Sequence, residues 1–125
     1  MTEALNGRRV LVVEDESLVA MLLETILEDL GCEVIGPAAT VEEAVALIRG
    51  DAGLDAALLD VNVGGQPVFP AAEALAERDV PFLFASGYGA AGLPDRWAGR
   101  PTIQKPFTEG AIGEALAAAM GAARA

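Results

Sequence analysis

The sequence contains no histidine and only one cysteine, Cys32. Nucleophile systems that depend on a histidine base are therefore excluded within this chain, and so are most zinc sites. A single cysteine also excludes an internal disulfide. We expect Cys32 to pack as a small buried apolar side chain.

Basic residues and long apolar runs are scarce as well. Eight Lys and Arg stand against 19 Asp and Glu, which gives a net charge of −11. Such a surface repels a phosphate backbone, so we expect no nucleic acid partner. It is compatible with a divalent cation or a basic protein surface, although most of the acids serve solubility. No stretch reaches the roughly 18 apolar residues of a membrane span, and no secretory signal is present, so we expect a cytoplasmic protein without membrane contact.

What the sequence does contain is a regular alternation of strand and helix patterns, with 53% apolar residues over 125 positions. Strands are predicted at 8–13, 33–36, 54–61, 81–85 and 102–104. Helices are predicted at 17–30, 41–49, 68–78 and from Thr108 to about Met120, with a short, weak helix near 93–97. This alternation predicts a parallel sheet covered by helices on both faces. The chain is expected to form one domain, 1–125, with its core at about 8–120 and no output domain.

Several local signals set the helix ends and faces. Leu18, Leu22 and Ile26 are spaced four apart and predict one broad apolar stripe on the first helix. The stripe is flanked by Val19, Leu23, Leu27 and Leu30. Thr40 and Glu43 form a capping-box pattern at the start of the second helix. Thr108 is predicted to cap the last helix, and the tail after Met120 is expected to fray.

Polar residues follow the predicted strands at the point where each strand ends. They are Glu14 and Asp15, Asp60, Ser86 and Lys105. Because the carboxyl ends of parallel strands share one edge of the sheet, these side chains should cluster there. Three carboxylates in a small volume favour a hard divalent cation such as Mg²⁺. With no histidine or cysteine nearby, a carboxylate is the expected nucleophile, and Asp60 would form an aspartyl phosphate.

This set, in this order and spacing, resembles the receiver domain of two-component response regulators, from about Arg8 to Met120. The resemblance implies a flavodoxin-like fold with strand order 2-1-3-4-5. It also implies that Asp60 accepts a phosphoryl group from the phosphohistidine of a histidine kinase or a histidine phosphotransfer protein. Glu14, Asp15, Asp60 and the backbone carbonyl of Asn62 would hold Mg²⁺. Ser86 would be the switch hydroxyl, and Lys105 would pair with the phosphoryl group.

The implied protein is a signalling module rather than an enzyme with a separate substrate, and it catalyses its own phosphotransfer. Its activated face would be read by a downstream protein that the sequence does not name, or the module would act as a phosphate sink. Receivers usually carry Tyr or Phe three residues before the lysine, where this chain has Thr102. The segment 81–89 resembles a single-domain subgroup with a Phe-Ala-Thr-Gly-Tyr segment, with Ser86 in place of the threonine. In that subgroup the fourth helix is short or mobile.

Other interpretations remain open at this stage. The acids at 14–16 on their own suit a helix N-terminus. A phosphohydrolase with an aspartate nucleophile is a second hypothesis, but such enzymes place an acid where this chain has Asn62, which cannot transfer a proton. A third is a receiver-like adaptor that is not phosphorylated. Tyr88 and Trp97 fit either the core or a partner surface.

Overall fold

The computed structural model describes residues 5–50, 53–86, 93–97, 99–104 and 107–124. Its main sheet has five parallel strands in the order β2-β1-β3-β6-β7. These strands are β1 (Arg9–Val13), β2 (Glu33–Ala38), β3 (Ala56–Asp60), β6 (Phe82–Ser86) and β7 (Thr102–Gln104). Counted along this sheet alone, the order is the predicted 2-1-3-4-5, and the fold is flavodoxin-like.

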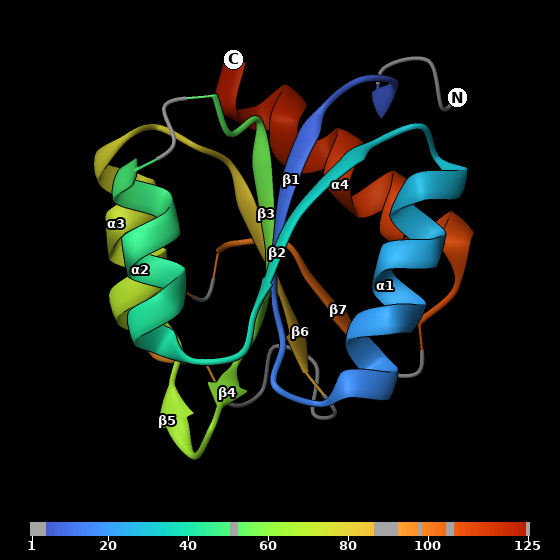
Figure 1. The fold of residues 1–125 in the computed structure, drawn as a ribbon. Helices are drawn as coiled ribbons and strands as arrows, with labels where there is room; N and C mark the ends of the chain where they lie inside the picture. The colour runs from blue at the N-terminus through green and yellow to red at the C-terminus, as the bar shows by residue number, and fades with distance from the viewer. Residues whose placement is uncertain (1–4, 51–52, 87–92, 98, 105–106, 125) are drawn as a thin grey trace.

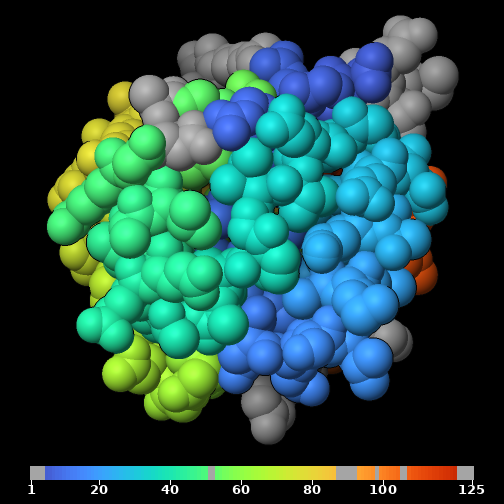
Figure 2. Space-filling model, viewed as in Figure 1, coloured from blue at the N-terminus to red at the C-terminus, as the bar shows by residue number. Residues whose placement is uncertain are grey.

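Helices cover both faces of the sheet, as the strand–helix alternation predicts. They are α1 (Ser17–Asp29), α2 (Val41–Gly50), α3 (Phe69–Glu77) and α4 (Glu109–Arg124). Figure 1 shows the sheet almost edge-on, with α2 and α3 on one side and α1 and α4 on the other. In the space-filling view of Figure 2, α2, the edge strand β2 and α1 form the near surface. Each helix pair therefore closes its own apolar core against one face of the sheet.

The two cores are built from alternate residues of the central strands. Val10 and Val12 face the α1 and α4 side, whereas Leu11 and Val13 face the α2 and α3 side. Every residue of β3 is buried, which fits an unbroken apolar strand in the middle of a parallel sheet. The strand therefore has no solvent-facing side, and its terminal Asp60 is the first polar group along it.

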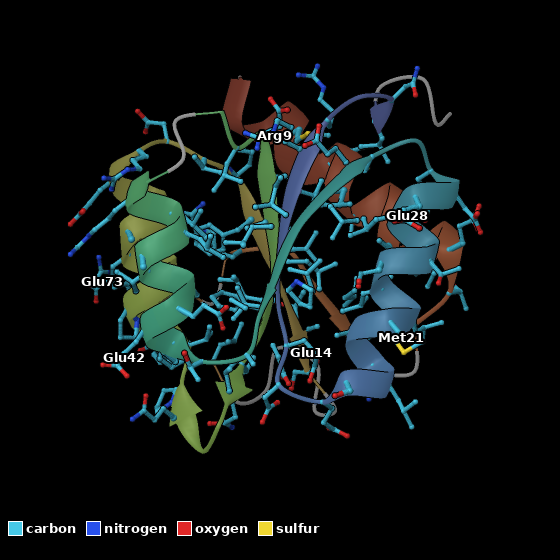
Figure 3. All side chains as sticks on the ribbon, in the orientation of Figure 1. Arg9, Glu14, Met21, Glu28, Glu42 and Glu73 are labelled. Carbon is cyan, nitrogen blue, oxygen red and sulfur yellow. The ribbon has the colours of Figure 1, made fainter. Side chains whose placement is uncertain are left out.

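The apolar stripe predicted on α1 faces the wrong way in part. Leu18 and Leu22 are 81% and 45% exposed, and Met21 is also exposed. Leu23, Ile26 and Leu27 of the predicted stripe are buried, together with Ala20. Residues 18–23 are all apolar, so spacing alone does not select one face of this helical turn. Figure 3 places Met21 on α1 at the surface, toward the same end of the molecule as Glu14.

Capping explains where α2 and α4 begin. The Thr40 hydroxyl accepts a hydrogen bond from the Glu43 amide at 3.0 Å. Glu43 Oε1 accepts a hydrogen bond from the Ala39 amide at 2.9 Å. Thr108 Oγ1 accepts the Ala111 amide at 3.1 Å. Both predicted caps are confirmed, and together they satisfy backbone N–H groups that the first helical turn leaves without intrahelical partners.

The ends of β2 and α4 differ from the prediction. β2 continues past Pro37 to Ala38, which pairs with Val13. Proline is tolerated there because β2 lies at the edge of the sheet. The tail expected to fray is helical to Arg124, since alanine and arginine are good helix formers.

The glycine-rich loop after Asp60 is a small hairpin that the sequence analysis did not predict. Its strands β4 (Asn62–Val63) and β5 (Gln66–Pro67) are antiparallel. Gly64 and Gly65 between them have φ values of 60° and 81°. Positive φ at both central residues is typical of a type I′ turn, which suits a two-residue hairpin.

The connection between β6 and β7 contains one 3₁₀ turn, η3 (Asp95–Trp97), in its described part. This agrees with the short helix predicted near 93–97. Trp97 is buried, and its ring packs against Phe69, Phe82 and Phe84. Trp97 is therefore a core residue rather than part of a partner surface, whereas Tyr88 lies outside the described residues.

Candidate functional site

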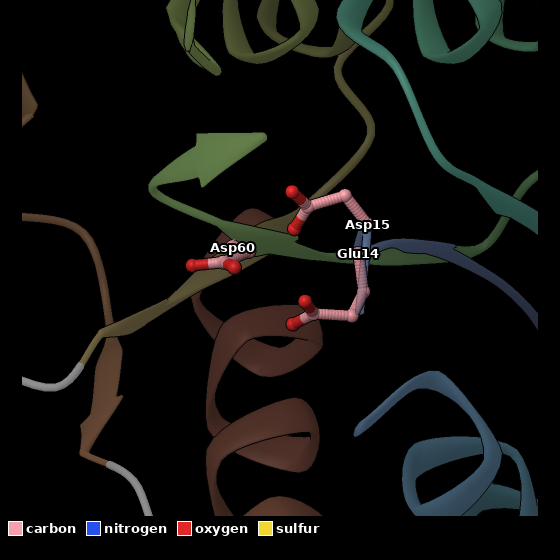
Figure 4. Close-up of side chains that lie close together, drawn as sticks. All are labelled: Glu14, Asp15 and Asp60. Carbon is pink, nitrogen blue, oxygen red and sulfur yellow. The ribbon is translucent and has the colours of Figure 1, made fainter. Parts of the chain in front are cut away.

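Three carboxylates meet where β1 and β3 end. Glu14 and Asp15 follow β1, and Asp60 is the last residue of β3. One carboxylate oxygen from each residue lies within 4.8 Å of the other two. Figure 4 shows the side chains of Glu14 and Asp15 reaching toward Asp60 from the end of β1. The predicted acidic cluster is therefore present at the carboxyl edge of the sheet.

The three carboxylates differ in their exposure to solvent. Glu14 is 2% exposed and Asp60 is 9% exposed, whereas Asp15 faces solvent. Asp15 is therefore the most accessible of the three carboxylates.

Backbone amides hold two of these carboxylates in place. The Glu16 amide donates to Glu14 Oε2 at 3.0 Å. The Gly64 amide donates to Asp15 Oδ2 at 3.0 Å, and these residues are far apart in the chain. Hydrogen bonds from backbone amides fix the orientation of a carboxylate. The β4–β5 hairpin therefore positions an acid that belongs to a different strand.

The remaining predicted site residues are Ser86, Asn62 and Lys105. Ser86 ends β6 and is buried. Asp60 is in register with Ala85, so Ser86 stands one residue further along the neighbouring strand. Asn62 is exposed and begins β4, two residues after Asp60. Lys105 lies outside the described residues.

The donor set suits a hard divalent cation. All three side chains offer carboxylate oxygens, and the described part of the cluster has no sulfur or nitrogen ligand. Carboxylate oxygens are the ligands that Mg²⁺ and Ca²⁺ take in proteins. Three like charges at this separation also repel one another, and a bound cation would relieve that repulsion. The residues therefore fit such an ion.

A family comparison decides the class of the protein. The family described as "Response regulator receiver domain" matches residues 10–117. The chain belongs to the response regulator receiver family. The matched range contains the positions of Glu14, Asp15, Asp60, Ser86 and Lys105, and the family is one of signalling domains.

Solved receivers resemble this one closely. SdrG from Sphingomonas melonis Fr1 is 46% identical, with a TM-score of 0.81 over 91% of this chain and 97% of that one. The receiver domain of Erythrobacter litoralis PhyR is 29% identical, with a TM-score of 0.80 over 94% of this chain and 93% of that one. Both likenesses span the whole receiver fold.

A curated relative extends the comparison to a longer protein. The phyllosphere-induced regulator PhyR of Methylorubrum extorquens is 31% identical over 119 residues, which cover 89% of this chain. This alignment covers only 43% of that relative, so the chain spans less than half of its length. Among the described residues, none of the helices is both long and apolar enough to cross a bilayer.

Two features beside the site were not predicted. One is the Gly64 amide on Asp15, and the other is the exposed apolar group on α1 formed by Leu18, Met21 and Leu22. The glycine pair that follows Asp60 was a signal for a hairpin. The exposed face of α1 gave no comparable signal, because six consecutive apolar residues conceal which of them face the sheet.

Proposed function

We propose that this receiver domain accepts a phosphoryl group on Asp60 in the presence of Mg²⁺ and passes the change to a partner protein. The observation that carries the proposal is the convergence of Glu14, Asp15 and Asp60 within 4.8 Å at one sheet edge. The receiver family match over residues 10–117 supports it. The donor would be the phosphohistidine of a histidine kinase or a histidine phosphotransfer protein, since the chain has no histidine of its own.

The proposed reaction is an in-line transfer between two protein side chains. A carboxylate oxygen of Asp60 attacks the phosphorus, an O–P bond forms, and the N–P bond of the donor imidazole breaks. The imidazole leaves and takes up a proton. Mg²⁺, when bound by Glu14, Asp15, Asp60 and the Asn62 carbonyl, supplies positive charge that offsets the charge of the phosphoryl group.

Two further residues complete the proposed site. Lys105 would pair with a phosphoryl oxygen as a point charge. The Ser86 hydroxyl would donate a hydrogen bond to another phosphoryl oxygen. Ser86 ends the strand beside β3, so a hydrogen bond made there would act on the connection that follows β6. We propose this connection as the segment that transmits the signal, because Thr102 offers no aromatic ring on β7.

The surface beside the site fits a protein donor. Leu18, Met21 and Leu22 expose apolar side chains near the start of α1, which follows Glu14 and Asp15 after one intervening residue. Exposed apolar groups gathered in one place mark interaction surfaces. A helical protein that carries the phosphohistidine would cover these side chains while its imidazole reaches Asp60.

Phosphorylation by a small donor tests the chemistry without a partner. Incubation with acetyl phosphate and Mg²⁺ should add one phosphate, measured as an increase in intact mass, and Asp60→Asn should abolish the addition. Glu42→Gln removes an exposed acid on α2 and should label like the wild type. Unchanged labelling of Asp60→Asn would overturn the assignment. Absence of both labelling and Mg²⁺ binding would instead favour an adaptor that is not phosphorylated.

A further inference from the structure

A second charged feature lies at the opposite edge of the sheet, around Arg100. Its guanidinium carbon is 4.5 Å from the centre of the Phe82 ring and 5.7 Å from the centre of the Trp97 ring. Phe82 begins β6, and Pro101 directly precedes β7, so this is the amino edge of the parallel sheet. Asp60 is at the other end of the strands. The feature is therefore separate from the acidic cluster.

Two aromatic rings hold Arg100 in place, and among the described residues it forms no ion pair. Within the ranges that the structure describes, ion pairs join Arg8 to Asp55, Arg9 to Glu33 and Arg96 to Glu73. In those same ranges no carboxylate lies within ion-pair distance of Arg100, despite the net charge of −11. Stacking on two rings orients the guanidinium and lowers the entropy cost of using its N–H donors.

A hollow opens beside this guanidinium. It has a volume of about 320 Å³, and its walls include Pro81, Phe82, Pro101 and Ala119, with Arg96 and Arg100 as its charged groups. A smaller hollow of about 170 Å³ adjoins Pro81 and Arg100 and has Asp79 on its wall. The larger volume is at the lower end of the range for small-ligand sites, about 300–1,000 Å³.

The chemistry of the walls limits the class of ligand. Trp97 and Phe82 are buried beneath the arginines, so no free aromatic face is offered to a nucleobase. Arg96 is already paired with Glu73, and Asp79 lies close by, which disfavours a dianion such as phosphate. An arginine fork matches a carboxylate, and the apolar walls match a short hydrocarbon group. We infer that this hollow binds an apolar monocarboxylate, with Arg100 pairing with the carboxylate.

Such a ligand has two sources, a free short-chain acid or the C-terminus of a peptide with an apolar last residue. Titration of the unphosphorylated protein with hexanoate, and separately with acetyl-Ala-Ala-Leu, distinguishes them. Trp97 is the only tryptophan, so its fluorescence reports on this corner directly. Backbone amide shifts of Arg100 and Ala119 give a second readout. Saturation by one probe alone identifies the source.

Matched controls distinguish an ion pair between Arg100 and the ligand carboxylate from general salt effects. Hexanamide and the peptide amide keep the hydrocarbon group but lose the charge, and they should bind about tenfold more weakly or worse. Arg100→Gln should abolish saturation. Arg49→Gln makes the same change of charge at the end of α2 and should bind like the wild type. These titrations use unphosphorylated protein, so their outcome does not depend on whether Asp60 accepts a phosphoryl group.

Three results would overturn the inference: no saturation with either acid, equal binding of acid and amide, or normal binding by Arg100→Gln. Circular dichroism shows whether that variant is folded. Where it is not, Arg100→Lys keeps the charge but loses the planar fork. It should bind several-fold more weakly, and wild-type affinity in Arg100→Lys would also contradict the assignment.

Discussion

Asp15 and Gly64 are joined by a hydrogen bond of 3.0 Å from the glycine amide to the aspartate carboxylate. The bond links the acid that follows β1 to the hairpin that follows β3. The hairpin needs positive φ at Gly64, so the geometry of this turn helps to determine where a candidate metal ligand lies. The acidic cluster thus depends on backbone shape as well as on the acids themselves.

The first prediction concerns the electrostatic repulsion among the carboxylates of Glu14, Asp15 and Asp60 and its effect on stability. Asp15→Asn keeps an oxygen that can accept the Gly64 amide but removes one negative charge. Without a divalent cation the variant should be more stable than the wild type by up to about 1 kcal/mol, because two carboxylates repel each other less than three do. With saturating Mg²⁺ the order should reverse, since the ion loses a ligand. Thermal unfolding with and without Mg²⁺ measures both effects.

Glu16→Gln is the matched control for this prediction, because Glu16 is an exposed acid in the same loop. It should show little change in either condition. If Asp15→Asn is destabilised without Mg²⁺ by as much as it is with Mg²⁺, the repulsion argument is wrong.

The second prediction concerns Trp97. Its ring centre lies between 5.8 and 6.5 Å from the centres of Phe69, Phe82 and Phe84. Trp97→Ala should lower the free energy of unfolding by about 3–5 kcal/mol, because it leaves a cavity in the core. Urea unfolding followed by circular dichroism gives the value. A loss below about 1 kcal/mol would show that the β6–β7 connection does not rely on this ring.

The third prediction concerns the exposed end of α1. Leu18→Ser combined with Leu22→Ser should slow phosphotransfer from a phosphohistidine protein and leave labelling by acetyl phosphate unchanged. The small donor does not need the apolar surface, whereas a protein donor would bury it. Rates from rapid-quench experiments with both donors make the comparison.

Glu28→Gln changes an exposed residue on the other half of α1 and serves as the control. Folding should be little affected by the leucine changes, since substitutions at exposed sites usually stay within about 0.5 kcal/mol. Equal slowing with both donors would point to damage at Asp60 instead.

The fourth prediction concerns Cys32. Burial raises the pKa of its thiol above the ordinary value of 9.0, and the nearby Asp55 carboxylate raises that pKa further. The neutral thiol is therefore favoured in the folded state. Its contribution to stability is complete below the ordinary pKa and is lost as the pH rises through the raised value. Above pH 9.0 the stability of the wild type should fall more steeply than that of Cys32→Ala.

Urea unfolding at a series of alkaline pH values tests the Cys32 prediction, because other titrating groups are common to both proteins. Parallel curves would mean that the thiol does not ionise with unfolding in this range. Slow alkylation of the native thiol, compared with the unfolded protein, is the accompanying expectation.

The sequence pattern by itself determined the parallel sheet and the composition of the acidic cluster, whereas the strand order 2-1-3-4-5 came from the resemblance to receiver domains. Alternating patterns of period 2 and 3.6 predict strands and helices, and the right-handed crossover rule then places every strand end on one edge. Glu14, Asp15 and Asp60 could be assigned to that edge because each directly ends or follows a strand. The caps of α2 and α4 were also predictable, since a capping bond spans only a few residues.

Only the tertiary structure decided which apolar residues of α1 face the core. In residues 18–23 every side chain is apolar, so the buried set depends on how α1 sits against the sheet and α4. The same holds for the Gly64 amide at Asp15 and for the Phe82 ring beneath Arg100. These contacts join residues distant in the chain, and local pattern carries no information about side chains that meet only after folding.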